Sequence, residues 1–213
     1  ARVVLLPANS AGDNIIFHAE GGDVVLPLLR QQKDGEECLS LSDFVKPCGT
    51  DYVGAFAVTA GRGIEEIISG YQQTDDFKAL LYQSLSDRLA EAAVELLHAR
   101  VRREVWGYAP DERIDRQRAL RAQYRGIRPA AGYPSLPDQS AIFAIEKIVG
   151  FANVGIAVTP NGAMSPASSV SGLMIAHPAS RYFMIGAIAP DQRRDYAARR
   201  GITEEELSKW LPK

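Results

Sequence analysis

The chain has 213 residues, of which 46% are hydrophobic and 23% charged, and a formal net charge of -2. This composition is typical of a globular domain with a sizeable core and excludes wholesale disorder. The near-neutral charge argues against nucleic acid or an anionic membrane surface as the main partner, because both select basic surfaces. No apolar run approaches the roughly 20 residues of a membrane-spanning helix. Cys38 and Cys48 fit no zinc spacing, so we expect reduced thiols in a cytoplasmic protein.

The first third of the chain alternates short apolar runs with turn residues, a pattern that predicts β-strands. We expect a hairpin turn at the two glycines 21–22, a strand in 38–45, and a central buried strand in 51–61, which is apolar on both faces. From about Asp75 to Trp106 there is no Pro or Gly, and apolar residues recur every three or four positions. This periodicity predicts one long helix.

The rest of the chain is expected to hold shorter elements. These are helices at 111–124 and 138–151, a strand–turn–strand unit at 155–178, and a strand at 181–189. Two short helices close the chain, and Thr203 with Glu206 forms a capping box at the start of the last one. Strands cluster early and late without regular βαβ alternation, so we expect an α+β fold with a mainly antiparallel sheet.

The stretch RPAAGYPSLPD, residues 128–138, is a candidate binding loop. Its three prolines exclude ordinary helix and interior strand. Arg128 is a permanent planar cation suited to a carboxylate or phosphate, and such a charged hydrogen bond contributes about 1.5–3 kcal/mol. Gly132 permits close approach of a ligand, and Tyr133 offers a ring and a hydroxyl. A structural crossover, in which the arginine caps the preceding helix, fits the same residues, and spacing alone leaves both interpretations open.

Asp87 and Glu91 are four residues apart on the long helix, so their carboxylates share one face. Two like charges this close repel each other unless a cation lies between them, and a solvated face beside Arg88 is the simpler alternative. His98 shares the face, but one histidine without a close-spaced partner is a poor metal signature. Nucleophile elbows, P-loops, dinucleotide fingerprints and zinc signatures are missing from the sequence. We therefore expect neither a self-sufficient catalytic centre nor a metal site.

Five long sequence segments, taken in chain order, carry a resemblance to a known family. They are DYVGAFAVTAG, LSDRLAEAAVELLHARVRREVWGYAPDE, YRGIRPAAGYPSLPD, ASSVSGLMIAHPASRYFMIG and YAARRGITEEELSKWL. Together they resemble the C-terminal activation domain of cobalamin-dependent methionine synthase. The resemblance implies that residues 1–213 form one C-shaped α+β domain with a twisted, mainly antiparallel sheet and one long helix.

The resemblance also implies a function. In this family the domain presents S-adenosylmethionine to inactive cob(II)alamin while flavodoxin or a related reductase supplies an electron, and methyl transfer restores methylcobalamin. S-adenosylmethionine is then the cofactor bound here, and the cobalamin-binding module of methionine synthase is the partner that carries cobalamin. The chain is expected to be part of a 5-methyltetrahydrofolate–homocysteine methyltransferase, and not to be catalytic alone.

The family's RxxxGY pattern is met by Arg128, Gly132 and Tyr133. By resemblance, Arg128 holds the methionyl carboxylate, and the backbone around Ala130 and Tyr133 brackets the ligand.

Two further pairs are assigned by resemblance. Asp87 and Glu91 match family carboxylates near the sulfonium, and Tyr182 with Phe183 are the counterpart of the family's paired aromatics.

The chain also departs from the family pattern. Ala122 stands where the family has a third acidic residue, and Leu136 and Gln139 stand where some members carry Cys and His. The family domain begins upstream of residue 1, in a segment with a ligand-contacting aspartate, so we expect one wall of the groove to be lacking.

The sequence is also compatible with two other functions. The chain could be a stand-alone docking protein for a corrinoid protein, without catalysis of its own. A free-standing methyltransferase is less favoured, because the sequence offers no general base and no acceptor pocket.

Overall fold

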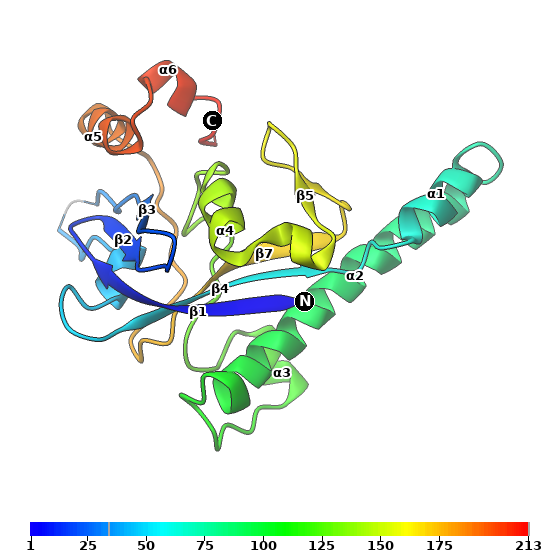
Figure 1. Cartoon of the computed structure of the whole chain (residues 1–213), viewed down its shortest axis with the longest axis horizontal. Coiled ribbons are helices and arrows are strands. Elements are labelled where there is room, and N and C mark those ends of the chain that lie inside the picture. The colour runs from blue at the N-terminus through cyan, green and yellow to red at the C-terminus, as the bar shows by residue number, and fades with distance from the viewer. Residues whose placement is uncertain (34, 213) are drawn as a thin grey trace.

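Five antiparallel strands form the central sheet (Figure 1). The computed structural model describes residues 1–33 and 35–212. The strands are β1 (Arg2–Ser10), β2 (Asn14–Phe17), β3 (Val24–Pro27), β4 (Tyr52–Thr59) and β7 (Ser169–Met174), in the order β3-β2-β1-β4-β7. Two further short strands, β5 (Ala157–Val158) and β6 (Met164–Ser165), pair with each other. The predicted α+β class with an antiparallel sheet is confirmed, and so is the turn at 21–22 between β2 and β3.

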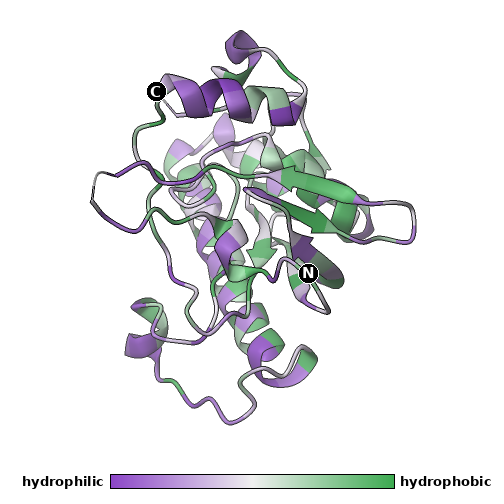
Figure 2. Cartoon of the chain, turned by 90° about the vertical axis from the view of Figure 1, so that its left-hand side faces the viewer, coloured by the Kyte–Doolittle hydropathy of each residue, from purple (hydrophilic) through white to green (hydrophobic). Residues whose placement is uncertain are grey.

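The two apolar faces of β4 contact different helices. Successive strand residues point to opposite faces, so Val53, Ala55 and Ala57 join one core cluster while Phe56 and Val58 join another. The first cluster includes Ile142 and Ile145 of α4 (Ala141–Val149), and the second includes Val94 of α2 (Asp76–Arg100). The strands are among the most hydrophobic segments in Figure 2, whereas the two C-terminal helices at the top are mainly hydrophilic. The sheet therefore lies between α4 and α2, as expected for a buried central strand.

The long helix begins as predicted. Asp75 caps it by accepting a hydrogen bond from the Lys78 N–H, and one π-helical turn, Val101–Val105, continues it beyond Arg100. An unpredicted helix, α1 (Ile64–Gln72), packs against its first half, and the two project from the sheet (Figure 1).

The buried face of α2 is not the one that its leucines mark. The residues that α2 buries are spaced four or seven positions apart and are mostly small: Ala79, Ser86, Ala90, Val94 and His98. Leu80, Leu85 and Leu89 are exposed, with between 49% and 65% of their surface accessible. Small side chains let the helix axis approach the sheet closely, and the larger ones lie on the opposite or flanking faces.

Three sequence predictions of secondary structure are wrong. Residues 38–45 contain a 3-10 helix, η1 (Leu41–Phe44), because the Ser40 and Asp43 side chains form a capping box there. Residues 181–189 form no strand, because the N–H groups of Phe183 and Ile185 donate to loop residues instead of a strand. The helix predicted at 111–124 is only α3 (Arg116–Leu120), since Ala122 adopts a positive φ of 52°.

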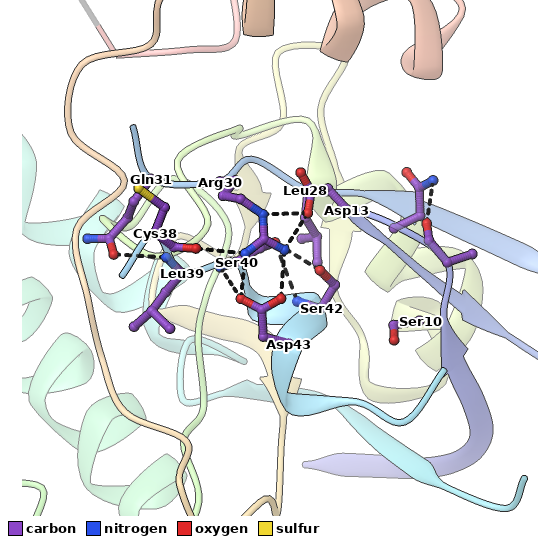
Figure 3. A network of polar contacts seen from close by, with 12 residues as sticks. Ser10, Asp13, Leu28, Arg30, Gln31, Cys38, Leu39, Ser40, Ser42 and Asp43 are labelled. Carbon is purple, nitrogen blue, oxygen red and sulfur yellow. Dashed lines mark hydrogen bonds and ion pairs between the residues drawn. The ribbon is translucent and has the colours of Figure 1, made fainter. Parts of the chain in front are cut away.

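The chain ends in α5 (Pro190–Arg200) and α6 (Glu204–Leu207), and the predicted Thr203–Glu206 capping box is confirmed. A polar network ties the η1 region to the β2–β3 hairpin (Figure 3). Arg30 donates to Asp13 at 2.9 Å through Nε and to Asp43 at 2.6 Å through Nη2. Of the helices described, none is both long and apolar enough to cross a bilayer.

Candidate functional site

A groove of about 1030 Å³ opens between α2, α3, the loop 128–135, β7 and the segment 182–184. Its polar lining includes Glu91 and Glu95 from α2 and Arg128 from the loop. Its apolar lining includes the rings of Tyr133, Tyr182 and Phe183, with Phe56 of β4 at the sheet. The volume is of the size that binds small organic ligands.

The loop that carries Arg128 is bound to the exposed edge of β7. Ile127 and Ile175 exchange two backbone hydrogen bonds of 2.9 Å, and the Leu173 N–H donates to the Pro129 carbonyl at 2.9 Å. Proline cannot donate in a sheet but its carbonyl can accept. Gly172 makes this approach possible, because a Cβ there would lie 2.5 Å from the Pro129 oxygen. The loop therefore has a fixed position relative to the sheet.

The Arg128 guanidinium is held by three side chains. Glu95 forms a close ion pair with it through both terminal nitrogens, and Nη1 also donates to the Tyr124 hydroxyl at 2.7 Å and to His98 Nδ1 at 3.3 Å. The side chain is 18% exposed. Burial opposes its charge, but Tyr124, Tyr182 and Glu95 outweigh burial, so the pKa of Arg128 is raised. Nε has no partner within the described part of the chain, and it leaves one edge of this fixed cation open.

His98 is a buried neutral support for that cation. Burial, reinforced by the charges of Arg102 and Arg128, lowers its pKa from 6.5 to about 2. Because arginine cannot accept, Nδ1 must be the acceptor toward Arg128, and Nε2 carries the proton that faces the Tyr108 hydroxyl at 3.4 Å.

The predicted acidic pair divides between two environments. The Glu91 carboxylate lines the groove and accepts from Arg88 at 2.8 Å, with both side chains exposed. Asp87 accepts from Ser168 Oγ at 2.6 Å and from Gln83 Nε2 at 2.9 Å, and is outside the groove lining. Asp87 thus joins α2 to the residues before β7. Across the described residues, no three His, Cys, Asp or Glu side chains are grouped to hold a metal ion.

The other predicted residues surround the loop. Ala130, Tyr133, Tyr182 and Phe183 line the groove, and the Tyr182 hydroxyl accepts from the Arg128 N–H at 2.9 Å. Gly132 is outside the lining. Its φ of +81° and its close approach to the Gln139 side chain give it a conformational role in the loop.

Sequence reasoning missed Glu95, Tyr124 and the support role of His98. Glu95 continues the four-residue spacing of Asp87 and Glu91, which was an available signal. Tyr124 lies four residues before Arg128 in an irregular segment, so no periodic pattern identifies it.

In this α+β fold, a large groove is surrounded by carboxylates, aromatic rings and the Arg128 guanidinium, whose Nε edge is unpaired among the described residues. These features define a small-molecule-binding domain. Residues 1–201 match the sequence profile of the family "Vitamin B12 dependent methionine synthase, activation domain", and the chain belongs to this family. It is also similar to a crystal structure of the MetH reactivation domain bound to AdoHcy. The TM-score is 0.92 at 39% sequence identity, and the match covers 98% of this chain and 67% of that chain. The resemblance inferred from the sequence is confirmed.

Proposed function

We propose that this domain binds S-adenosylmethionine in the groove and presents its methyl group to cobalamin during reductive reactivation of methionine synthase. The observation that carries the proposal is the similarity, at 39% identity over nearly the whole chain, to a reactivation domain with AdoHcy bound. AdoHcy is S-adenosylmethionine without the transferred methyl group, so a groove shaped for one ligand accommodates the other.

Arg128 is the proposed partner of the methionyl carboxylate. Glu95 contacts its two terminal nitrogens, so the edge that includes Nε remains for a ligand. A carboxylate on that edge gains a planar, charge-assisted contact. Because Glu95, Tyr124 and His98 already fix the side chain, little rotamer entropy is lost when the ligand binds.

Carboxylates on α2 are the proposed partners of the sulfonium. Glu91 and Glu95 both line the groove, and an opposite charge nearby stabilises a cation. The Arg88 contact to Glu91 is exposed and is therefore weak, so Glu91 is available to a ligand. Asp87, which lies outside the lining, is proposed to act by fixing α2 to the start of β7.

Aromatic and backbone groups of the groove are proposed to hold the rest of the ligand. The rings of Tyr133, Tyr182 and Phe183 offer faces for the adenine, and Tyr133 is 65% exposed. The Ala130 N–H has no partner within the described residues, so this backbone donor is free beside the cation. Gly132 is proposed to keep the loop in the conformation that presents these groups.

S-adenosylmethionine supplies a methyl group activated by the sulfonium charge. The residues of this chain bind and orient that donor. We propose that the cobalamin-binding module of methionine synthase supplies the acceptor, and flavodoxin or a related reductase the electron. The alternative, a docking protein for a corrinoid protein, differs in one respect: it has no need of the groove ligand.

Calorimetric titration with S-adenosylmethionine tests the proposal. We expect one site in the wild-type chain, and Arg128→Ala should weaken binding about tenfold to a hundredfold, which corresponds to losing a charged hydrogen bond. Arg128→Lys keeps the charge but loses the planar fork, so its affinity for S-adenosylmethionine should lie between those of the wild type and Arg128→Ala. Arg194→Ala is the control, because Arg194 is exposed on α5, away from the groove. No binding by the folded wild-type chain, or equal binding by all variants, would overturn the assignment.

A further inference from the structure

A second cavity, of about 530 Å³, lies on the far side of α3 from the groove. Arg116, Ala119 and Leu120 of α3 line the first cavity, whereas Asp115 and Arg118 line the second. Four arginines and two acidic residues are among the lining of the second cavity: Arg102, Arg103, Arg113, Arg118, Glu112 and Asp115. The guanidinium groups therefore outnumber the carboxylates by two.

Both carboxylates are already engaged. The Glu112 carboxylate accepts from Arg102 Nε at 2.6 Å and from the Arg125 N–H at 3.2 Å. Asp115 caps α3 by accepting from the Arg118 N–H at 2.8 Å. The side chains of Arg113 and Arg118 are exposed and form no hydrogen bond or ion pair with the described residues. The cavity thus has surplus positive charge.

Arg102 adds a buried positive charge to the wall of this cavity. Its side chain is 1% exposed, and its Nη1 is a buried donor without a partner among the residues described. Its guanidinium also stacks 4.2 Å from the centre of the Tyr124 ring, which fixes its position. A buried charged donor left unsatisfied is costly. Arg102 is also part of the cavity lining, so an anion bound there would lie beside this buried guanidinium.

We propose that this cavity binds a phosphate group. Guanidinium forks match phosphate oxygens in planar, two-point contacts, and a dianion is attracted by the charges of Arg113 and Arg118, which are unpaired among the described residues. Glu112 holds the buried arginine in place, while Arg113 and Arg118 close over the anion from the exposed side. The ligand is either inorganic phosphate or the phosphate group of a small monoester, for which the cavity has room.

The test is calorimetric titration with inorganic phosphate and, separately, with adenosine 5′-monophosphate, at constant ionic strength in chloride. Saturating S-adenosylmethionine is present in parallel runs, so that binding in the main groove is blocked. We expect one site for phosphate whether or not the groove is filled. Tighter binding of the monoester identifies a phosphorylated small molecule as the ligand, and tighter binding of the inorganic ion identifies free phosphate.

Variants locate the site. The double substitution Arg113→Gln with Arg118→Gln removes two exposed side chains, and we expect at least tenfold weaker phosphate binding with the fold retained. Arg102→Met should abolish binding. Arg121→Gln is the matched control, because Arg121 is an exposed arginine of the same segment that lines neither cavity. Absence of binding by both phosphates, or equal losses in the double variant and the control, overturns the proposal.

Discussion

Arg128 acts in this molecule as a fixed cation rather than as a flexible surface arginine. Glu95 and His98 of α2, with Tyr124 of the segment before the loop, hold the guanidinium through its terminal nitrogens. Truncating it therefore exposes unpaired neighbours as well as removing a ligand contact. For this reason the lysine variant, which keeps a charge in place, is the more informative one.

At Glu91, we expect the substitution Glu91→Gln to weaken S-adenosylmethionine binding several-fold and to leave S-adenosylhomocysteine binding nearly unchanged. Only the first ligand carries a sulfonium, so only it loses a charge interaction, which at an exposed carboxylate is worth up to about 1 kcal/mol. Paired calorimetric titrations measure both affinities. Glu66→Gln, on exposed α1 away from the groove, is the control. Equal losses of affinity for the two ligands would show that Glu91 does not interact with the sulfonium charge.

The lowered pKa of buried His98 predicts that the stability of the domain depends on pH. The pKa of this histidine is lowered from 6.5 to about 2 in the folded chain, so below pH 6.5 the unfolded chain binds a proton that the folded chain excludes. The unfolding free energy should then fall as the pH drops, by about 2 kcal/mol from pH 7 to pH 5. Urea denaturation at pH 5, 6 and 7 measures it. His98→Gln removes the titrating ring and should flatten the slope; an unchanged slope would contradict the assignment.

At the scale of elements, β7 and the binding loop act as one unit. Ile127, just before the loop, exchanges backbone hydrogen bonds with Ile175, just after β7, and Pro129 of the loop accepts one from Leu173 of β7. The N–H groups of segment 183–185 in turn donate to the loop at Pro134 and Ser135. An edge strand with unpaired groups readily accepts such additions. The position of Arg128 therefore depends on the sheet, through β7, and on α2, through Glu95.

Gly172 is the point where this junction is tightest. In Gly172→Ala, the new Cβ meets the Pro129 carbonyl oxygen at 2.5 Å and the Ala130 Cα at 3.1 Å. We expect a loss of about 1–3 kcal/mol in unfolding free energy, the usual effect of overpacking. Weaker S-adenosylmethionine binding should accompany it, because the loop is displaced.

Urea denaturation and calorimetry measure the two effects. Gly70→Ala on α1 is the control, because a Cβ there meets nothing within 4 Å and helix propensity favours alanine by up to about 1 kcal/mol. A Gly172→Ala variant as stable as the wild type, with unchanged affinity, would show that the contact between β7 and the loop tolerates a methyl group.

At the scale of the whole molecule, we expect the domain to bind the methyl donor without transferring the methyl group alone. A bound donor reacts faster only when the acceptor is held in line at short range. With S-adenosylmethionine, reduced flavodoxin and free cob(II)alamin, the chain should form no methylcobalamin above background. Adding the cobalamin-binding module should be required for activity. Cobalt absorbance with each component omitted in turn measures this, and catalysis by the chain without that module would contradict it.

The sequence by itself determined the features that depend on local interactions. The absence of Pro and Gly between Asp75 and Trp106 predicts the long helix, Thr203 and Glu206 predict the last N-cap, and the two apolar faces of 51–61 predict a strand covered on both sides. In each case the responsible residues are neighbours in the chain. The family resemblance likewise assigned ligand contacts to Arg128 and Tyr133 from short contiguous motifs, and both residues line the groove.

The tertiary structure decided what depends on residues distant in sequence. Segment 181–189 has the apolar pattern of a strand, yet its N–H groups donate to the loop at Pro134 and Ser135. The apolar spacing of α2 predicted a helix, but the sheet decided that small residues such as Ala79, Ser86 and Ala90 form its buried face, because they allow closer packing. Glu95 is 33 residues before Arg128 and becomes its ion-pair partner only when α2 and the loop meet at β7.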